Sequence, residues 1–208
     1  MTDQLVLTFA EIEFMLRLQQ PNLDVRELLR FRPEATGDVV AAAGLASLLA
    51  RELCADSEGK VRAGQEITAV SRILTTADVE VDALGWIGEE MVLLHVFSSP
   101  DGQLACRPCG RNLFTVEALE AGAPLSAALV RLLDLCLTGD GESAVLMRLS
   151  TTAGEPISLA VARGADGGWN LSDSTVDGTI SEQVTPEQAR GRVVELFGGD
   201  SAALGATQ

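Results

Sequence analysis

The sequence predicts an α+β protein: a duplicated antiparallel β-sheet plus helix unit with pseudo-two-fold symmetry and a helical N-terminal third. Three observations predict this class. Apolar residues recur at helical spacing as far as residue 77, the period changes to two from Asp78, and two later segments each contain strands followed by an apolar helix. With 208 residues, 47% of them apolar, the chain can bury the core of one compact domain.

The N-terminal segment, 1–77, is expected to be helical and to pack on the sheet. Thr8 and Glu11 have the spacing of a capping box, and Pro21 ends the helix that this box begins. Val39–Ala50 is the longest apolar run of the chain and is expected to be a buried core helix. The expected helices are the one behind Thr8 and those at 24–30, 39–54 and 65–76.

The first sheet-helix unit is expected at 78–140. VEVDALGW, MVLLHVFSS and GQLACRPC alternate as strands do, and SPDG joins the last two as a hairpin turn, because Asp-Gly tolerates positive φ. NLFTVEA is either a fourth strand or the lead-in to an apolar helix that begins near Pro124. This helix carries a stripe of leucines on one face, which predicts that it packs on the strands.

The second sheet-helix unit is expected at 141–199. AVLMRLS, PISLAVAR, WNLSDS and GTISEQV are predicted strands. Thr185, Pro186 and Gln188 then begin a helix, with a cap, a proline at the first position and a glutamine at the third. The helix ends at the glycine pair 198–199, and residues 200–208 are expected to form a disordered tail.

Composition excludes several classes of partner. The chain carries 15 basic and 30 acidic residues, a formal charge of −15, so phosphates of nucleic acid and anionic lipid are repelled. Lys60 is the only lysine, which is typical of a GC-rich bacterial genome. No secretory signal is expected in MTDQLVLTFAEIEF, and the apolar run at 39–50 is too short to cross a bilayer. The sequence therefore predicts a cytoplasmic protein without membrane insertion.

Two cysteines and the single histidine are the chemical candidates. Cys106 and Cys109 form a C-x-x-C pair, but a redox pair of this type sits at a helix N-terminus, and this one lies at the end of a predicted strand. A zinc site needs four ligands, and no second chelating pair accompanies Cys54, Cys136 and His95. His95 stands in an apolar strand without a triad partner. We therefore expect no catalytic, cofactor-binding or metal-binding residues, and the pair at 106 and 109 is interpreted as two strand residues at a kink made by a proline.

One segment favours a binding function. LGWIGEEM, residues 84–91, joins two predicted strands, which would place Trp86 and Ile87 near the tip of a hairpin. Exposed aromatic and branched side chains in such a loop anchor protein partners. The alternative is that the strand continues through Trp86 and buries it in the core.

The order of elements resembles the EspG family, cytosolic chaperones of type VII (ESX) secretion in actinobacteria. The resemblance rests on ILTTADVEVDALGW, MVLLHVFSSPDGQLACRPCGRNLFTVEALEAG and LVRLL, and on AVLMRLS, PISLAVARGADGGWNLSDS and ARGRVVELF in the second half. It implies a pseudo-symmetric α+β fold with no cofactor. It also implies that the protein binds a helical PE–PPE-type secretion substrate, shields its hydrophobic tip and keeps it soluble.

Three functional hypotheses follow. The leading one is a non-catalytic, EspG-like chaperone. A broader version is an actinobacterial α+β adaptor with another protein partner. The enzymatic alternative is a thiol-dependent oxidoreductase that uses Cys106 and Cys109, which would require one thiolate of depressed pKa.

Overall fold

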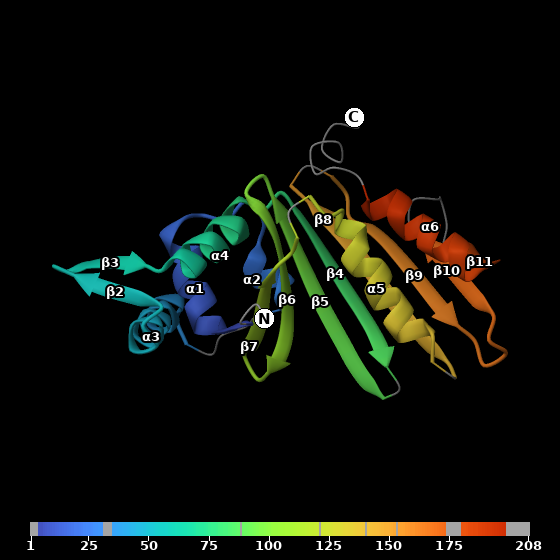
Figure 1. Cartoon of the computed structure of the whole chain (residues 1–208), viewed down its shortest axis with the longest axis horizontal. Coiled ribbons are helices and arrows are strands. Elements are labelled where there is room, and N and C mark those ends of the chain that lie inside the picture. Colours follow the sequence, from blue (N-terminus) through green and yellow to red (C-terminus); the bar gives the residue numbers. More distant parts are fainter. Residues whose placement is uncertain are drawn as a thin grey trace. The chain divides into compact units, whose positions relative to one another are not determined.

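The computed structural model describes residues 4–30, 35–87, 89–120, 122–139, 141–152, 154–173 and 180–198. The fold is α+β, with a large antiparallel sheet and helices (Figure 1). The chain forms two compact units, each made of two stretches. The N-terminal unit comprises Met1–Asp78 and Phe97–Leu119, and the C-terminal unit comprises Val79–Val96 and Glu120–Gln208. Strand β5 (Glu90–Ser99) contributes to both.

The N-terminal unit packs helices on a group of antiparallel strands. Its strands follow the order β1-β7-β6-β5, and β1 pairs with β7 from Leu5↔Val116 to Thr8↔Leu113. Buried residues of α1, α4 and these strands, Ile12, Leu74 and Phe97 among them, form one apolar core. The elements are β1 (Leu5–Thr8), α1 (Phe9–Leu18), α2 (Val25–Leu28), α3 (Gly37–Ala50), β2 (Cys54–Ser57), β3 (Lys60–Ala63), α4 (Gln65–Thr76), β6 (Gly102–Gly110) and β7 (Leu113–Ala118).

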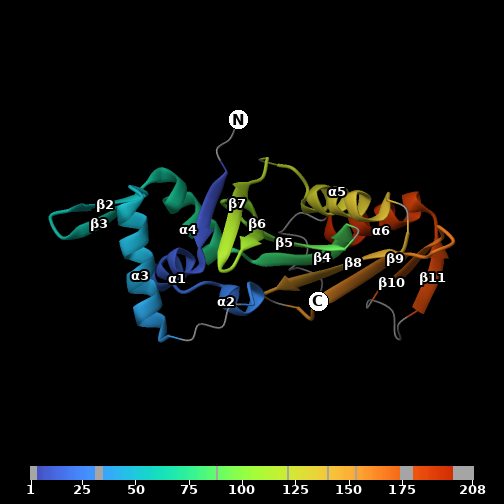
Figure 2. The same cartoon turned by 90° about the horizontal axis from the view of Figure 1, so that it is seen from below.

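The C-terminal unit packs two helices on one side of its strands, as Figure 2 shows. The strand order is β5-β4-β8-β9-β10-β11, and each pairing that fixes the register of β8 to β11 is antiparallel. A capping box between Thr185 and Gln188 begins α6. The elements are β4 (Val79–Ile87), α5 (Leu125–Leu137), β8 (Ser143–Thr151), β9 (Ile157–Arg163), β10 (Trp169–Asp173), β11 (Ile180–Val184) and α6 (Pro186–Phe197).

The N-terminal segment is only partly as the sequence predicts. The capping box at Thr8 and Glu11 is confirmed, as is the helix at 65–76. The segment is not simply helical, however, because it also contains β1 and the hairpin of β2 and β3. The hairpin turns at Glu58 and Gly59, both at positive φ, and extends away from α3 and α4 in Figures 1 and 2.

The expectation of a buried core helix at 39–50 is wrong. Helix α3 forms there, but only Gly44 and Leu48 are buried. Val39 is exposed, as are several alanines of the helix. Alanine favours helix without needing burial, so an alanine-rich run predicts the helix correctly and its environment poorly. The proposed tail at 200–208 lies outside the described residues.

Glu11 connects three elements of the N-terminal unit. Its fully buried carboxylate accepts hydrogen bonds from the Thr8 main chain at 2.7 Å, from Ser47 Oγ at 2.8 Å and from Arg51 Nη1 at 2.8 Å. Burial alone would raise the pKa of this carboxyl. The three hydrogen-bonding partners outweigh burial and hold the pKa below its ordinary value of 4.5.

Glu11→Gln is expected to lower the free energy of unfolding by about 1–2 kcal/mol at neutral pH, because the partners of the carboxylate lose a charged acceptor. Since the folded pKa lies below 4.5, this contribution is present above that value and is lost as the pH falls through the folded pKa. Urea unfolding at a series of pH values checks this. The difference in free energy of unfolding between Glu11→Gln and wild type should narrow below pH 4.5. The control Glu187→Gln, at an exposed position, should have the same free energy of unfolding as wild type. A difference in free energy of unfolding that does not change with pH would contradict the prediction.

Candidate protein-binding surface

Gly85 shows which face of β4 the helices cover. A Cβ at Gly85 would lie 2.6 Å from Cys136 Sγ of α5 and 3.2 Å from Val145 Cγ2 of β8. Gly85 therefore faces α5. Because successive side chains of a strand point to opposite faces, Leu84 and Trp86 face away from the helices.

The face turned away from α5 and α6 is apolar over three strands. Leu84 of β4 pairs with Leu146 of β8, which in turn pairs with Ala160 of β9. Leu146 is 46% exposed and Trp86 37%, while the others are half-buried. We call this surface the open apolar face; it consists of Leu84, Trp86, Ala144, Leu146, Ala160 and Ala162.

The position of Trp86 agrees in part with each of the two interpretations of its sequence, an exposed anchor near a hairpin tip and a residue within a strand. Strand β4 does continue through Trp86, but the side chain is exposed and not part of the core. Burial raises the pKa of the Cys136 thiol of α5, and the nearby Trp86 main chain partly offsets this rise, so the backbone of β4 at Trp86 lies close to α5 while the indole belongs to the opposite face. Met91, near the start of β5, is exposed as well. Ile87 ends β4, and its side chain lies outside the described residues.

The other end of this face of β4 is polar and buried. Glu80 and His95 are both fully buried, and His95 Nδ1 lies 3.0 Å from Glu80 Oε1. Burial raises the pKa of the Glu80 carboxyl, and the hydrogen bond with His95 offsets this rise only in part. Arg148 of β8 is exposed and pairs in register with Asp82. His95 is thus a packed residue beside a carboxyl group.

The C-x-x-C pair lies within β6, as the sequence predicts, and not at a helix N-terminus. None of the four cysteines forms a disulfide in the part of the chain that the structure describes; Cys106 is fully buried, whereas Cys109 is exposed. The register of β6 with β7 shifts between Pro108 and Gly110, which is the kink expected at this proline. Within the described ranges, no three His, Cys, Asp or Glu side chains are grouped closely enough to hold a metal ion.

The open apolar face has a signal in the sequence beyond Trp86. In AVLMRLS, residues 144–150, the helix-facing positions are Val145, Met147 and Leu149, yet the intervening Ala144 and Leu146 are apolar too. An antiparallel strand with one solvated face alternates apolar and polar residues. A strand with apolar residues on both faces therefore indicates that the face away from the helices is hydrophobic as well.

The fold has a counterpart among solved structures. No protein-family model matches the sequence, and no curated protein is significantly similar to it. The structure is similar to the type VII secretion system chaperone EspG5 of Mycobacterium tuberculosis, solved in complex with the PE25–PPE41 dimer. The TM-score is 0.61, the match covers 91% of this chain and 94% of that chain, and 12% of residues are identical. The chain therefore has an EspG-like fold.

Over the part of the chain that the structure describes, none of the helices is both long and apolar enough to cross a bilayer.

Proposed function

We propose that the protein is a non-catalytic, cytoplasmic chaperone of the EspG type, which binds a helical PE–PPE-type secretion substrate and keeps it soluble. The observation that carries this proposal is the EspG-like fold over 91% of the chain. The open apolar face, with Trp86 at its end, is the proposed binding surface. The proposed source is an actinobacterium, in keeping with the arginine-rich and lysine-poor sequence.

Physical chemistry supports this assignment. A charge of −15 keeps the body of the protein soluble while an apolar surface remains available. An amphipathic helix places apolar side chains at i, i+3 and i+4 against such a surface, and a tryptophan at its edge supplies much of the affinity. This function needs no activated acid, base or thiol.

A duplication is the proposed origin of the fold. The element order β4-β5-β6-β7-α5 is repeated as β8-β9-β10-β11-α6, which corresponds to the predicted units 78–140 and 141–199. The first strands of the two repeats, β4 and β8, pair antiparallel with each other. A pseudo-two-fold axis between β4 and β8 would require this pairing.

No observation favours the thiol-dependent alternative. Cys106 has no exposed surface, and Cys109 is the residue at the register shift between Pro108 and Gly110 of the same strand. A redox pair needs an accessible, acidified thiolate close to its resolving partner. The adaptor alternative uses the same apolar face and differs only in the partner.

The partner can be identified by affinity purification of the tagged protein from its source organism, followed by mass spectrometry. We expect a secreted, helix-rich PE–PPE-type protein or pair in near-equal amount. A stoichiometric partner of another class would favour the adaptor hypothesis, and the absence of any stoichiometric partner would refute the chaperone proposal.

Trp86→Ala is expected to weaken binding of that partner by about tenfold or more, because truncation of a tryptophan anchor removes most of its contact area. The melting temperature should fall by no more than about 2 °C, as for other surface substitutions. Calorimetry and thermal unfolding measure the two quantities. Leu135→Ala on α5 is the matched control, because Leu135 is 57% exposed but lies outside the open apolar face. A large loss of stability in Trp86→Ala would place Trp86 in the core instead.

A further inference from the structure

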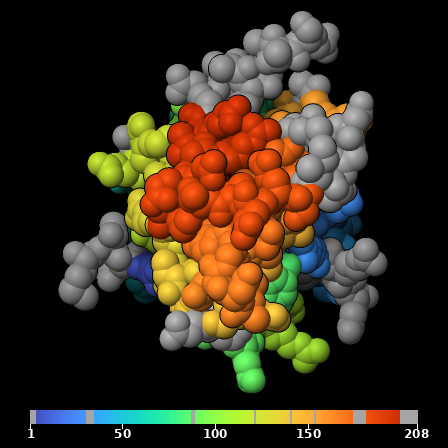
Figure 3. Space-filling model, turned by 90° about the vertical axis from the view of Figure 1, so that its right-hand side faces the viewer, coloured from blue at the N-terminus to red at the C-terminus, as the bar shows by residue number. Residues whose placement is uncertain are grey.

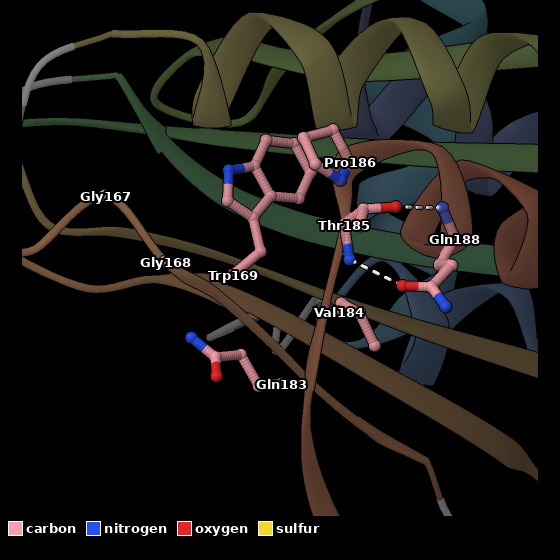
Figure 4. Close-up of a pocket in the computed structure, with 8 residues that line it drawn as sticks. All are labelled: Gly167, Gly168, Trp169, Gln183, Val184, Thr185, Pro186 and Gln188. Atoms are coloured by element: carbon pink, nitrogen blue, oxygen red, sulfur yellow. Dashed lines mark hydrogen bonds between the residues drawn. The ribbon is translucent and has the colours of Figure 1, made fainter.

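A second surface feature of the C-terminal unit is a cavity of about 400 Å³ where β10 begins and α6 follows β11. Figure 3 looks onto this end of the molecule, where β9 to β11 and α6 are coloured orange to red. Trp169, Val184 and Pro186 supply apolar walls, and Gln183 and Gln188 supply amide groups (Figure 4). Trp169 pairs with Arg163 at a helix-covered position of β9, so the indole lies on the opposite side of the sheet from the open apolar face. Gln183 pairs with Asn170 and therefore lies on the same side as that face.

The Trp169 indole is the informative wall of the cavity. The residue is 7% exposed, yet its indole N–H forms no hydrogen bond with any described residue. Figure 4 shows the indole nitrogen at the ring edge farther from Pro186. Trp169 Nε1 is not among the fully buried polar atoms that lack a partner, so this N–H reaches the surface of the cavity, where the acceptor of a ligand could replace water.

Further donors line the same cavity. Gln188 Oε1 accepts a hydrogen bond from the Thr185 main chain at 2.7 Å, which leaves the two N–H groups of the Gln188 amide available. The Gln183 side chain is exposed. A Cβ at Gly168 would lie 3.2 Å from Gln183 Nε2, so glycine at this position leaves room beside the amide. The Gln188 amide therefore adds donors to the cavity, whereas the Gln183 amide lies on the other side of β10 from the indole (Figure 4).

These donors fit main-chain carbonyl groups that are not already hydrogen-bonded. A helix uses its carbonyls internally, whereas an extended segment leaves them free. β11 is also the last strand in the order of its sheet, so an extended segment could pair with its outer edge. Exposed Glu182 adjoins the lining residue Gln183 and favours basic residues in the segment, whereas Glu187 already lies 3.8 Å from Arg190.

We propose that this cavity binds an extended, basic segment of a partner protein. An apolar side chain of the segment packs against Trp169 and Pro186, and a main-chain carbonyl accepts a hydrogen bond from Trp169 Nε1. The indole lies on the opposite side of the sheet from the open apolar face, so this site can bind its ligand whether or not the chaperone proposal holds.

The test selects binders from a phage-displayed library of random linear dodecapeptides on the Trp86→Phe protein, in which Trp169 is the sole tryptophan. Peptides that also bind Trp169→Phe are removed, because that variant lacks the indole N–H but keeps an aromatic ring. We expect enriched peptides that combine lysine or arginine with aliphatic residues or proline. Their binding should shift the fluorescence of Trp169 and protect the amides of residues 181–184 from hydrogen exchange.

Synthetic copies of the selected peptides give the affinities. Trp169→Phe should weaken binding by about tenfold, the usual effect of one lost hydrogen bond. Glu182→Lys should also weaken it without altering the cavity wall, and Glu90→Lys, the same charge change at an exposed site on β5, should not. The proposal is overturned if no sequence is enriched, or if the enriched peptides bind Glu182→Lys as tightly as wild type.

Discussion

His95→Leu is expected to lower the free energy of unfolding by about 3–5 kcal/mol, because it removes the partner of a buried carboxyl group. Glu80 and His95 are both fully buried and are linked by a 3.0 Å contact between Glu80 Oε1 and His95 Nδ1. Leucine is of similar size and cannot hydrogen-bond to Glu80. Urea unfolding followed by circular dichroism at neutral pH measures the loss.

The same substitution should change how stability depends on pH. The folded pKa of Glu80 is raised by burial, so its favourable contribution is present below the ordinary value of 4.5 and is lost as the pH rises through the folded pKa. Without the hydrogen bond from His95, that pKa rises further, and the loss continues to higher pH. His95→Leu should therefore lose more free energy of unfolding than wild type as the pH rises above 4.5.

A second variant separates ionisation from packing. Adding Glu80→Gln to His95→Leu removes the charge while it keeps the shape of the side chain, so the extra pH dependence should disappear. If His95→Leu loses less than about 1 kcal/mol, or if its pH profile equals that of wild type, the pair does not stabilise the fold in this way.

The strands were the most predictable part of the fold, because their period of two depends on one buried face. VEVDALGW and AVLMRLS alternate as expected for β4 and β8, and the capping boxes before α1 and α6 fix where those helices begin. The strand pairing between β4 and β8 could not be predicted in the same way, because it depends on contacts between residues sixty or more positions apart. It is this pairing that places Leu84 beside Leu146 and creates the open apolar face.

The N-terminal segment was harder to predict for two physical reasons. β1 and the hairpin of β2 and β3 are only four residues long each, too short for an alternating pattern to stand out. Helix α3 is rich in apolar residues and yet largely exposed, because most of these residues are small alanines that need not be buried. Its apolar composition therefore does not predict its burial. The sequence indicates Trp86 as a binding residue because LGWIGEEM joins two predicted strands and places it near the tip of a hairpin. The role of Trp169 depends on a cavity that forms only once β10, β11 and α6 have packed.

Gly44→Ala is expected to lower the free energy of unfolding by about 2–3 kcal/mol, although alanine normally stabilises a helix. A Cβ at Gly44 would overlap the Ala10 carbonyl and lie 2.9 Å from the Glu11 main-chain nitrogen. These are backbone atoms of α1, which cannot rotate out of the way as a side chain does. The two helices would have to separate, and the core residues beneath them would lose contact. Thermal and urea unfolding of the variant measure the loss.

Gly191→Ala in α6 is the matched control for this prediction. The substitution is the same and the residue is again inside a helix, but a Cβ at Gly191 would meet no atom within 4 Å. Helix propensity then acts alone, and the free energy of unfolding should rise by about 0.5–1 kcal/mol. Opposite signs for the two variants would show that close contact between α1 and α3 requires glycine at position 44. A gain in stability in both variants would mean that α3 can move away from α1 without cost, and that α3 is held to its unit mainly by the ion pair of Arg51 with Glu11.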